Sequence, residues 1–172
     1  MGLKFNLASG TDIRDGWINF DIVPRWPLAA RGCDVIWDAK RQPIPYACNT
    51  ADEVYAGYLL LHLPPKYHKQ VLMEIQRVLS PSGILTVGEV DMNIVMRRYL
   101  DNPLDSRLSE LIWGEQGNAH GDAFSEFDKH CQGFTDDSLR HLLIECGFVD
   151  LNRITIHCKE VFYELTITCR KK

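Results

Sequence analysis

The sequence predicts a single α/β domain built on a mostly parallel sheet, with helices on both faces and one antiparallel strand at the C-terminal end. Two observations lead to this prediction. Short apolar runs alternate with stretches of helical periodicity along most of the chain, a pattern typical of parallel sheets covered by helices. Two strand-like runs then follow each other directly near the C-terminus, which favours an antiparallel pair. The 172 residues suffice for one domain, over 1–172, and are too few for two.

The first half of the chain is expected to supply five strands and one helix. Helical spacing of apolar residues predicts a helix over 67–79, which the turn-forming residues 80–83 end. Residues 84–90 are rich in apolar and β-branched side chains, as in a buried strand. Runs closed by turn-forming residues predict the earlier strands at 4–7, 17–22, 34–37 and 52–56.

The second half begins with two expected helical pieces over 92–113, separated at Asn102-Pro103. Residues 114–133 show no clear period and are expected to form a long loop. Thr135, followed by two acids, predicts the N-cap of a helix that ends at Cys146. The terminal strand pair is expected at 149–157 and 161–169.

Composition narrows the classes of partner. The formal net charge is −4 and no basic stripe stands out, so we do not expect nucleic acid as a partner. No apolar run approaches the roughly 18 residues of a membrane helix, and no signal peptide is visible, so we expect no membrane association. The six cysteines include no CxxC pair. We interpret them as reduced thiols of a cytoplasmic protein and expect no metal site.

Small residues after the first expected strand and an acid after the second indicate a nucleoside site. Ala8-Ser9-Gly10 lets a ligand approach the backbone closely, and Asp21 could accept hydrogen bonds from ribose hydroxyls. A dinucleotide is disfavoured, because its glycine fingerprint would fall on Ala8, Gly10 and Ile13. Asp21 also follows too soon for a full helix between the two strands. Asp38, after the third strand, either reaches an adenine edge or caps a turn.

Three segments resemble a family of small, single-domain class I S-adenosylmethionine-dependent methyltransferases. Residues 4–21, KFNLASGTDIRDGWINFD, look like its first strand, glycine-containing loop and Gly-Trp-Ile-Asn-x-Asp element. Residues 51–85 look like its fourth strand, His-Leu turn, helix and Arg-Val-Leu-x-Pro-x-Gly turn, and residues 133–148 look like its late helix. The resemblance implies a Rossmann-like class I methyltransferase sheet and S-adenosyl-L-methionine as the cofactor.

The resemblance also implies cofactor contacts at the ends of the first four strands. Two positions depart from the family: its first loop glycine is Ala8 here, and the acid often found before the histidine of the fourth-strand turn is Leu61. The implied cofactor-binding residues are Ala8, Ser9, Gly10, Asp21, Ile22, Asp38, Ala39, Gly57 and Tyr58.

His62 is the candidate catalytic residue, because a hydroxyl or amine acceptor needs a base to take its proton. The alternative is a histidine that only fixes the turn. Glu89 and Asp91, at the end of the fifth expected strand, either face the pocket or cap the next helix. The long loop also carries a polar cluster that could bind a polar substrate or a metal. Its spacing matches no known ligand pattern, which favours a solvated loop. The members of this cluster are His120, Asp122, Asp128 and His130.

We therefore expect methyl transfer from S-adenosylmethionine to a small-molecule or glycan acceptor. The alternative is a non-catalytic S-adenosylmethionine-binding module that acts as a partner subunit. The chain lacks the Asn/Asp-Pro-Pro-aromatic element of amino-group methylation on nucleic-acid bases, which argues with the acidic charge against DNA. The exposed edge of the terminal strand pair could pair with a second copy to form a homodimer.

Overall fold

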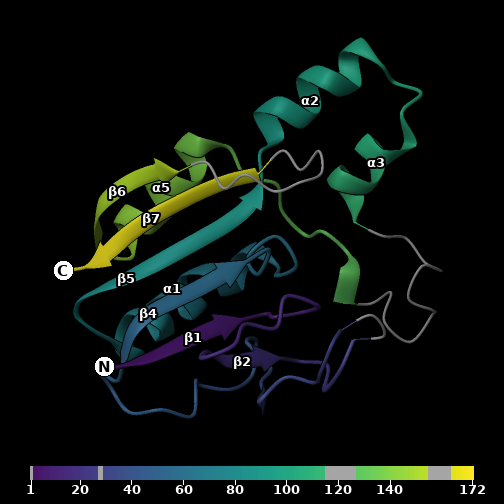
Figure 1. Ribbon diagram of the computed structural model, residues 1–172. Coiled ribbons are helices and arrows are strands. Elements are labelled where there is room, and N and C mark those ends of the chain that lie inside the picture. Colours follow the sequence, from purple (N-terminus) through teal and green to yellow (C-terminus); the bar gives the residue numbers. More distant parts are fainter. Residues whose placement is uncertain (1, 27–28, 115–126, 155–163) are drawn as a thin grey trace.

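A seven-stranded sheet in the order β3-β2-β1-β4-β5-β7-β6 forms the centre of the molecule (Figure 1). The computed structural model describes residues 2–26, 29–114, 127–154 and 164–172. β7 runs antiparallel to both of its neighbours, and the other neighbouring pairs are parallel. The α/β class and the mostly parallel sheet are thus confirmed. The strands are β1 (Leu3–Leu7), β2 (Ile18–Asp21), β3 (Val35–Ile36), β4 (Ala51–Gly57), β5 (Leu79–Val90), β6 (Phe148–Ile154) and β7 (Glu164–Lys171).

The helices lie close to their expected positions. The break at Asn102-Pro103 separates α2 from α3, as predicted, and Thr135 caps α5 through a reciprocal capping box with Ser138. β5 begins earlier than expected, because residues 80–83 lie within the strand. Parts of the expected loop 114–133 and of the terminal strand pair lie outside the described residues. The helical elements are η1 (Pro65–Tyr67), α1 (His68–Val78), α2 (Met92–Asp101), α3 (Ser106–Trp113) and α5 (Asp136–Glu145).

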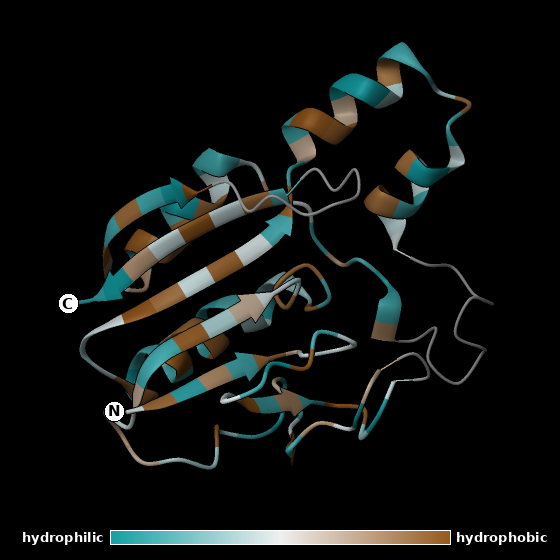
Figure 2. Cartoon of the chain, viewed as in Figure 1, coloured by the Kyte–Doolittle hydropathy of each residue, from teal (hydrophilic) through white to brown (hydrophobic). Residues whose placement is uncertain are grey.

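The hydrophobic core lies on the sheet face that α1 and α5 cover, behind the sheet in Figure 1. Alternate residues of the central strands are buried there, and the strand register aligns Phe5 with Val54 and Val54 with Leu85. Figure 2 shows the matching alternation of hydrophobic and hydrophilic residues along β5 and β7. Burial of this face supplies the main driving force for folding. Among the described helices, none is long and apolar enough to cross a membrane.

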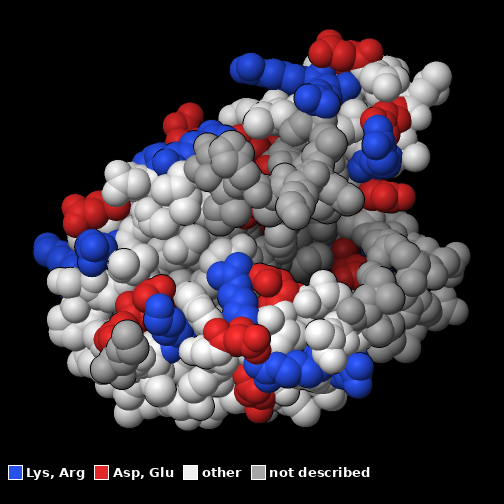
Figure 3. All heavy atoms as spheres, viewed as in Figure 1, with Lys and Arg blue, Asp and Glu red and all other residues white. Residues whose placement is uncertain are grey.

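The loop 8–17 covers part of the opposite face of the sheet and forms no helix, which agrees with the short spacing between the first two strands. The Asn6 amide donates to the Asp12 carbonyl oxygen at 2.6 Å and to Asn19 Oδ1 at 2.9 Å. The Arg14 guanidinium stacks 3.5 Å from the centre of the Tyr55 ring. The loop 8–17 thus packs on one face of the sheet, and α1 and α5 pack on the other. Figure 3 shows Lys and Arg interspersed with Asp and Glu over the side of the molecule seen in Figure 1.

Candidate functional site

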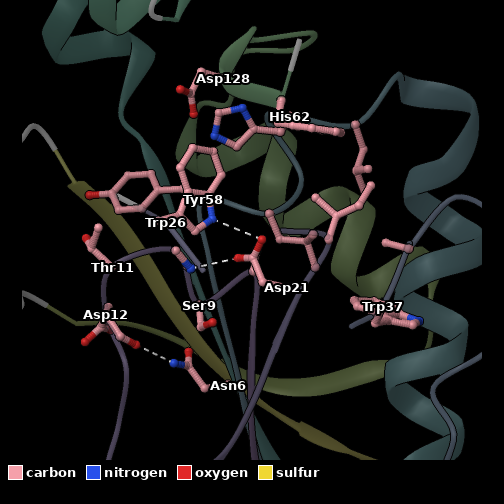
Figure 4. A pocket seen from close by; sticks show the side chains of 18 of the residues that line it. Asn6, Ser9, Thr11, Asp12, Asp21, Trp26, Trp37, Tyr58, His62 and Asp128 are labelled. Atoms are coloured by element: carbon pink, nitrogen blue, oxygen red, sulfur yellow. Dashed lines mark hydrogen bonds between the residues drawn. The ribbon is translucent and has the colours of Figure 1, made fainter. Parts of the chain in front are cut away.

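A cavity of about 400 Å³ opens at the carboxyl ends of β1, β2 and β4 (Figure 4). In open α/β sheets this is the edge where ligands bind. The structure brings the nine residues implied for cofactor binding and the candidate catalytic residue His62 to the wall of this cavity. They are Ala8, Ser9, Gly10, Asp21, Ile22, Asp38, Ala39, Gly57, Tyr58 and His62.

Eleven further residues line the cavity and carried no predicted role as cofactor-binding or catalytic residues. Most come from loops whose position depends on tertiary packing, so no local pattern identifies them. Asp128 belongs to the polar cluster noted in the sequence, whereas His120 and Asp122 lie outside the described residues. The further lining residues are Asn6, Thr11, Asp12, Trp26, Trp37, Lys40, Tyr55, Leu59, Leu63, Phe127 and Asp128.

The end of β1 turns sharply into the cavity wall. Ala8 has φ 52°, a left-handed conformation that glycine adopts more easily than alanine. Ser9 follows, only 3% exposed, and donates its backbone N–H to the Phe20 carbonyl oxygen at 2.9 Å. Within the described part of the chain, the Ser9 hydroxyl is buried and has no hydrogen-bond partner. A buried, unsatisfied hydroxyl on a cavity wall indicates a place for a polar ligand atom.

The Asp21 carboxylate ties the first two strand ends together. Oδ2 accepts the Gly10 N–H at 2.8 Å, and Oδ1 accepts the Val23 N–H at 2.9 Å and the Trp26 indole N–H at 3.1 Å. Because a carboxylate offers about four acceptor positions, these three bonds leave one at Oδ2. The side chain is thus held rigidly in place with room for one further donor.

The loop after β3 forms another wall. Asp38 accepts the Lys40 N–H at 2.9 Å and lies 3.5 Å from the Arg41 guanidinium. The turn-capping interpretation of Asp38 is therefore correct, and the residue lines the cavity as well. Trp37, 3% exposed, anchors this loop by donating its indole N–H to the Gln42 carbonyl oxygen at 3.0 Å.

The end of β4 lets an aromatic side chain lie flat against the sheet. A Cβ at Gly57 would come within 2.6 Å of the Tyr55 ring, so only glycine leaves room for that ring. Tyr58 then adopts φ 54° and donates its N–H to the Gly88 carbonyl oxygen at 2.7 Å. This left-handed residue follows the end of β4 and begins the turn 58–63, which carries His62.

His62 is placed beside Tyr58 and Asp128 at one end of the cavity (Figure 4). Its Nδ1 lies 3.2 Å from the Lys129 carbonyl oxygen. A carbonyl oxygen can only accept, so Nδ1 carries the proton and Nε2 keeps its lone pair. Burial, followed by the nearby His130 ring, lowers the pKa of His62 to about 4. The two rings pack edge to face with centroids 5.1 Å apart. His62 is therefore neutral at physiological pH.

Glu89 and Asp91 do not line the cavity. Asp91 accepts the Asn93 N–H at 3.0 Å as the N-cap of α2 and forms an ion pair of 2.6 Å with Arg153, so the helix-capping alternative is confirmed for Asp91. Glu89, fully buried, instead accepts peptide N–H groups of the turn 58–63. Leu61, where the family often has an acid, is 2% exposed and part of the core.

The charges around the cavity favour a cation. Four carboxylates and one ammonium group line it. Arg14 and Arg41, which do not line the cavity, pair with Asp12 and Asp38 and partly offset their charge, so a small excess of negative charge remains around the cavity. Aromatic rings on the wall add faces that attract positive charge. Across the described ranges, His, Cys, Asp and Glu side chains form no group of three that could hold a metal ion.

Comparison with known proteins supports the fold. No protein-family model matches the sequence, and no curated protein matches it either. A SAM-dependent methyltransferase from Methanosarcina mazei is similar in structure, with TM-score 0.63 and 17% identity over 99% of this chain and 92% of that one. A possible histamine N-methyltransferase from Thermotoga maritima gives TM-score 0.63 and 20% identity over 100% of this chain and 83% of that one.

A third solved structure has both a substrate and a cofactor product bound. It is a 1,6-didemethyltoxoflavin-N1-methyltransferase from Burkholderia thailandensis, with 1,6-didemethyltoxoflavin and S-adenosylhomocysteine, at TM-score 0.61 and 19% identity. The match covers 99% of this chain and 71% of that one. The chain described here therefore has the Rossmann-like fold of class I methyltransferases.

Proposed function

We propose that this chain transfers a methyl group from S-adenosylmethionine to a small-molecule or glycan acceptor. The observation that carries the proposal is the cavity of about 400 Å³ at the carboxyl ends of β1, β2 and β4. All nine residues that the family resemblance implies for cofactor binding line it, together with His62. A similar fold that binds 1,6-didemethyltoxoflavin supports a small organic acceptor.

The cavity wall suits an adenosine-containing cation. The free acceptor position on Asp21 matches one ribose hydroxyl, and the buried Ser9 hydroxyl matches a polar atom of the ligand. The loop 8–17 contains no helix, so the helix N-terminus that cradles a pyrophosphate is missing from this place. A ligand with a ribose and a positive charge, but without phosphates, fits these features best.

When bound, S-adenosylmethionine supplies a methyl group that its sulfonium already activates. The protein has to orient the acceptor, exclude water and take a proton. His62 is neutral, with its Nε2 lone pair available, and we assign it the proton-accepting role. Tyr58, which lies beside His62, would help to exclude water from the same end of the cavity.

Calorimetric titration tests cofactor binding. We expect S-adenosylmethionine and S-adenosylhomocysteine to bind and NAD not to bind. Asp21→Ala should weaken binding by about 1–3 kcal/mol, the cost of losing a charged hydrogen-bond partner. Asp15→Ala removes a fully exposed acid of the same loop and is the matched control. If neither methionine-derived ligand binds the wild-type protein, the proposed function is wrong.

A methyl-release screen over small-molecule and glycan acceptors then separates an enzyme from a binding module. We expect turnover with at least one acceptor, and a fall in kcat of about 10²–10⁴-fold for His62→Gln with cofactor affinity retained. His141→Gln, on the exposed side of α5, is the control. Cofactor binding without turnover on any acceptor would instead support the partner-subunit alternative.

A further inference from the structure

Glu89 is a fully buried acid at the end of β5 whose two oxygens both face peptide groups. Oε1 accepts the Leu60 N–H at 2.9 Å, and Oε2 accepts the Leu61 N–H at 3.3 Å. The side chain is 0% exposed and does not line the cavity. Burying a carboxyl group is costly, so this position calls for an explanation beyond packing.

The same turn is fastened from its other side through its carbonyl groups. His68 Nε2, on α1, lies 2.9 Å from the carbonyl oxygens of both Leu60 and Leu63. Carbonyl oxygens only accept, so the His68 Nε2–H is shared between them. The Cys131 N–H donates to the Leu61 carbonyl oxygen at 2.6 Å. The peptide groups of Leu60 and Leu61 are therefore held on both their donor and acceptor sides.

His62 follows directly after these two fastened residues. Its ring position at the cavity depends on the backbone of the turn 58–63 and on the Lys129 carbonyl oxygen. A rotation of the Leu60 and Leu61 peptide groups would displace the imidazole. The Lys129 carbonyl oxygen holds the Nδ1–H tautomer of His62 only while the ring stays within hydrogen-bond distance of it.

A carboxylate is the side chain that matches two consecutive peptide N–H groups. Both of its oxygens accept. Glutamine has one acceptor oxygen, and its NH₂ group would point a donor at another donor. The choice of Glu89 over an amide or an apolar residue is therefore explained by the turn that it holds.

We propose that Glu89 is a positioning residue that fixes the turn 58–63 and thereby the orientation of His62 at the cavity. The functional importance of this role rests on the proposed methyl transfer, whereas the structural effect can be tested without it.

Ionisation of Glu89 provides a readout. Burial raises the pKa of Glu89 to about 8, while its two peptide N–H partners oppose the rise, and no charged side chain contributes. The titratable groups of the surrounding elements are His62 in the turn, His68 on α1, and the α2 N-cap Asp91, which is paired with Arg153 of β6. Above this pKa both Glu89 oxygens accept, and below it one of them becomes a hydroxyl.

NMR of the full chain tests the proposal through the ring nitrogens of His62. At about pH 9, where Glu89 is ionised, we expect the wild-type protein to show the Nδ1–H tautomer alone. Glu89→Gln should show a mixture of tautomers at the same pH, with a smaller difference from wild type at about pH 6. Asp91→Asn is the matched control, because it neutralises a buried acid of the same strand end without touching the turn. Its His62 signals should match those of the wild type.

The proposal is overturned if folded Glu89→Gln keeps the wild-type tautomer at both pH values, or if Asp91→Asn perturbs it equally. If Glu89→Gln fails to fold, an NMR titration of the wild-type protein tests the proposal instead. Its Leu60 and Leu61 amide proton signals should shift together with the carboxyl carbon of Glu89 in one titration, and the absence of this shift rejects the role. Since no ligand is used, a failure of cofactor binding would count against the proposed function and not against this inference.

Discussion

Ala8 occupies a backbone conformation that favours glycine, and glycine is the residue that the resembling family has there. Its φ is 52°, and the left-handed region costs an L-residue about 1–2 kcal/mol. Glycine avoids this cost but loses about 0.5–1 kcal/mol through its freedom in the unfolded chain. We expect Ala8→Gly to raise the free energy of unfolding by about 0.5–1 kcal/mol in urea titrations. Ala47→Gly, at an exposed position without positive φ, should lower it. Equal destabilisation by both variants would contradict this account.

The low pKa of His62 makes stability depend on pH in a defined window. The pKa is about 4 in the folded chain and about 6.5 in an unfolded one. Between these values the unfolded chain binds a proton at His62 that the folded chain does not, so stability falls as pH drops. We expect the wild-type free energy of unfolding to decline more steeply than that of His62→Gln, by at most about 1.4 kcal/mol per pH unit. His141→Gln should parallel the wild type, and parallel curves for all three would refute the shift.

The conformation of the loop 8–17 depends on the buried side-chain amide of Asn19 in β2. Its Oδ1 accepts the Asn6 amide and the Arg14 N–H, each at 2.9 Å. Its Nδ2 donates to the carbonyl oxygens of Arg14 and Trp17 and to Asp34 Oδ2. The Asn19 side chain thus connects the loop 8–17 to β1 and β2 through hydrogen bonds.

Removing this amide should be costly. We expect Asn19→Ala to lower the free energy of unfolding by about 2–3 kcal/mol, because it leaves buried donors without partners. Chemical denaturation measures the loss. Asn93→Ala, at an exposed position of α2, should change it by less than about 0.5 kcal/mol. A loss at Asn19 as small as that at Asn93 would show that the loop does not need the amide.

Local signals explain which elements could be predicted. The cap at Thr135 and the break at Asn102-Pro103 depend on neighbouring residues, so the sequence alone indicated both correctly. The early start of β5 follows from pairing of Leu79 with Ala51 of β4, which is a tertiary contact. Asn19 was visible within the Gly-Trp-Ile-Asn-x-Asp element, but only the folded chain shows that its partners lie across β1 and the loop 8–17.

For the whole molecule, the parallel topology explains why the site residues were predictable. Residues that follow parallel strands meet at one edge of the sheet. Locating the strand ends in the sequence was therefore enough to predict that Asp21, Gly57 and the other implied residues lie around one cavity. Trp26 was not foreseen, because its place on the wall follows from the path of the connection after β2. The placement of helices also required the structure, since α1 and α5 share one face while the loop 8–17 takes the other.

We predict that the chain forms a homodimer through the edge strand β6. β6 ends the sheet on one side, and unpaired strand edges invite pairing with a second chain. We expect sedimentation velocity to show concentration-dependent dimers and Ile154→Lys, at a 37% exposed position of β6, to shift them to monomers. Leu104→Lys, at a 92% exposed position between α2 and α3, should leave the dimers intact. Monomers throughout the concentration series would contradict the prediction.

Ala8 and Tyr58 end two neighbouring strands in the same left-handed conformation, with φ 52° and 54°. Their consequences for laboratory evolution differ. In a selection for heat resistance, glycine at position 8 would remove the strain of the left-handed backbone, and the cavity wall would lose only one methyl group. The same relief at position 58 would remove the aromatic ring beside His62. We therefore expect such a selection to accept glycine readily at the first position and to reject it at the second whenever ligand binding is selected as well.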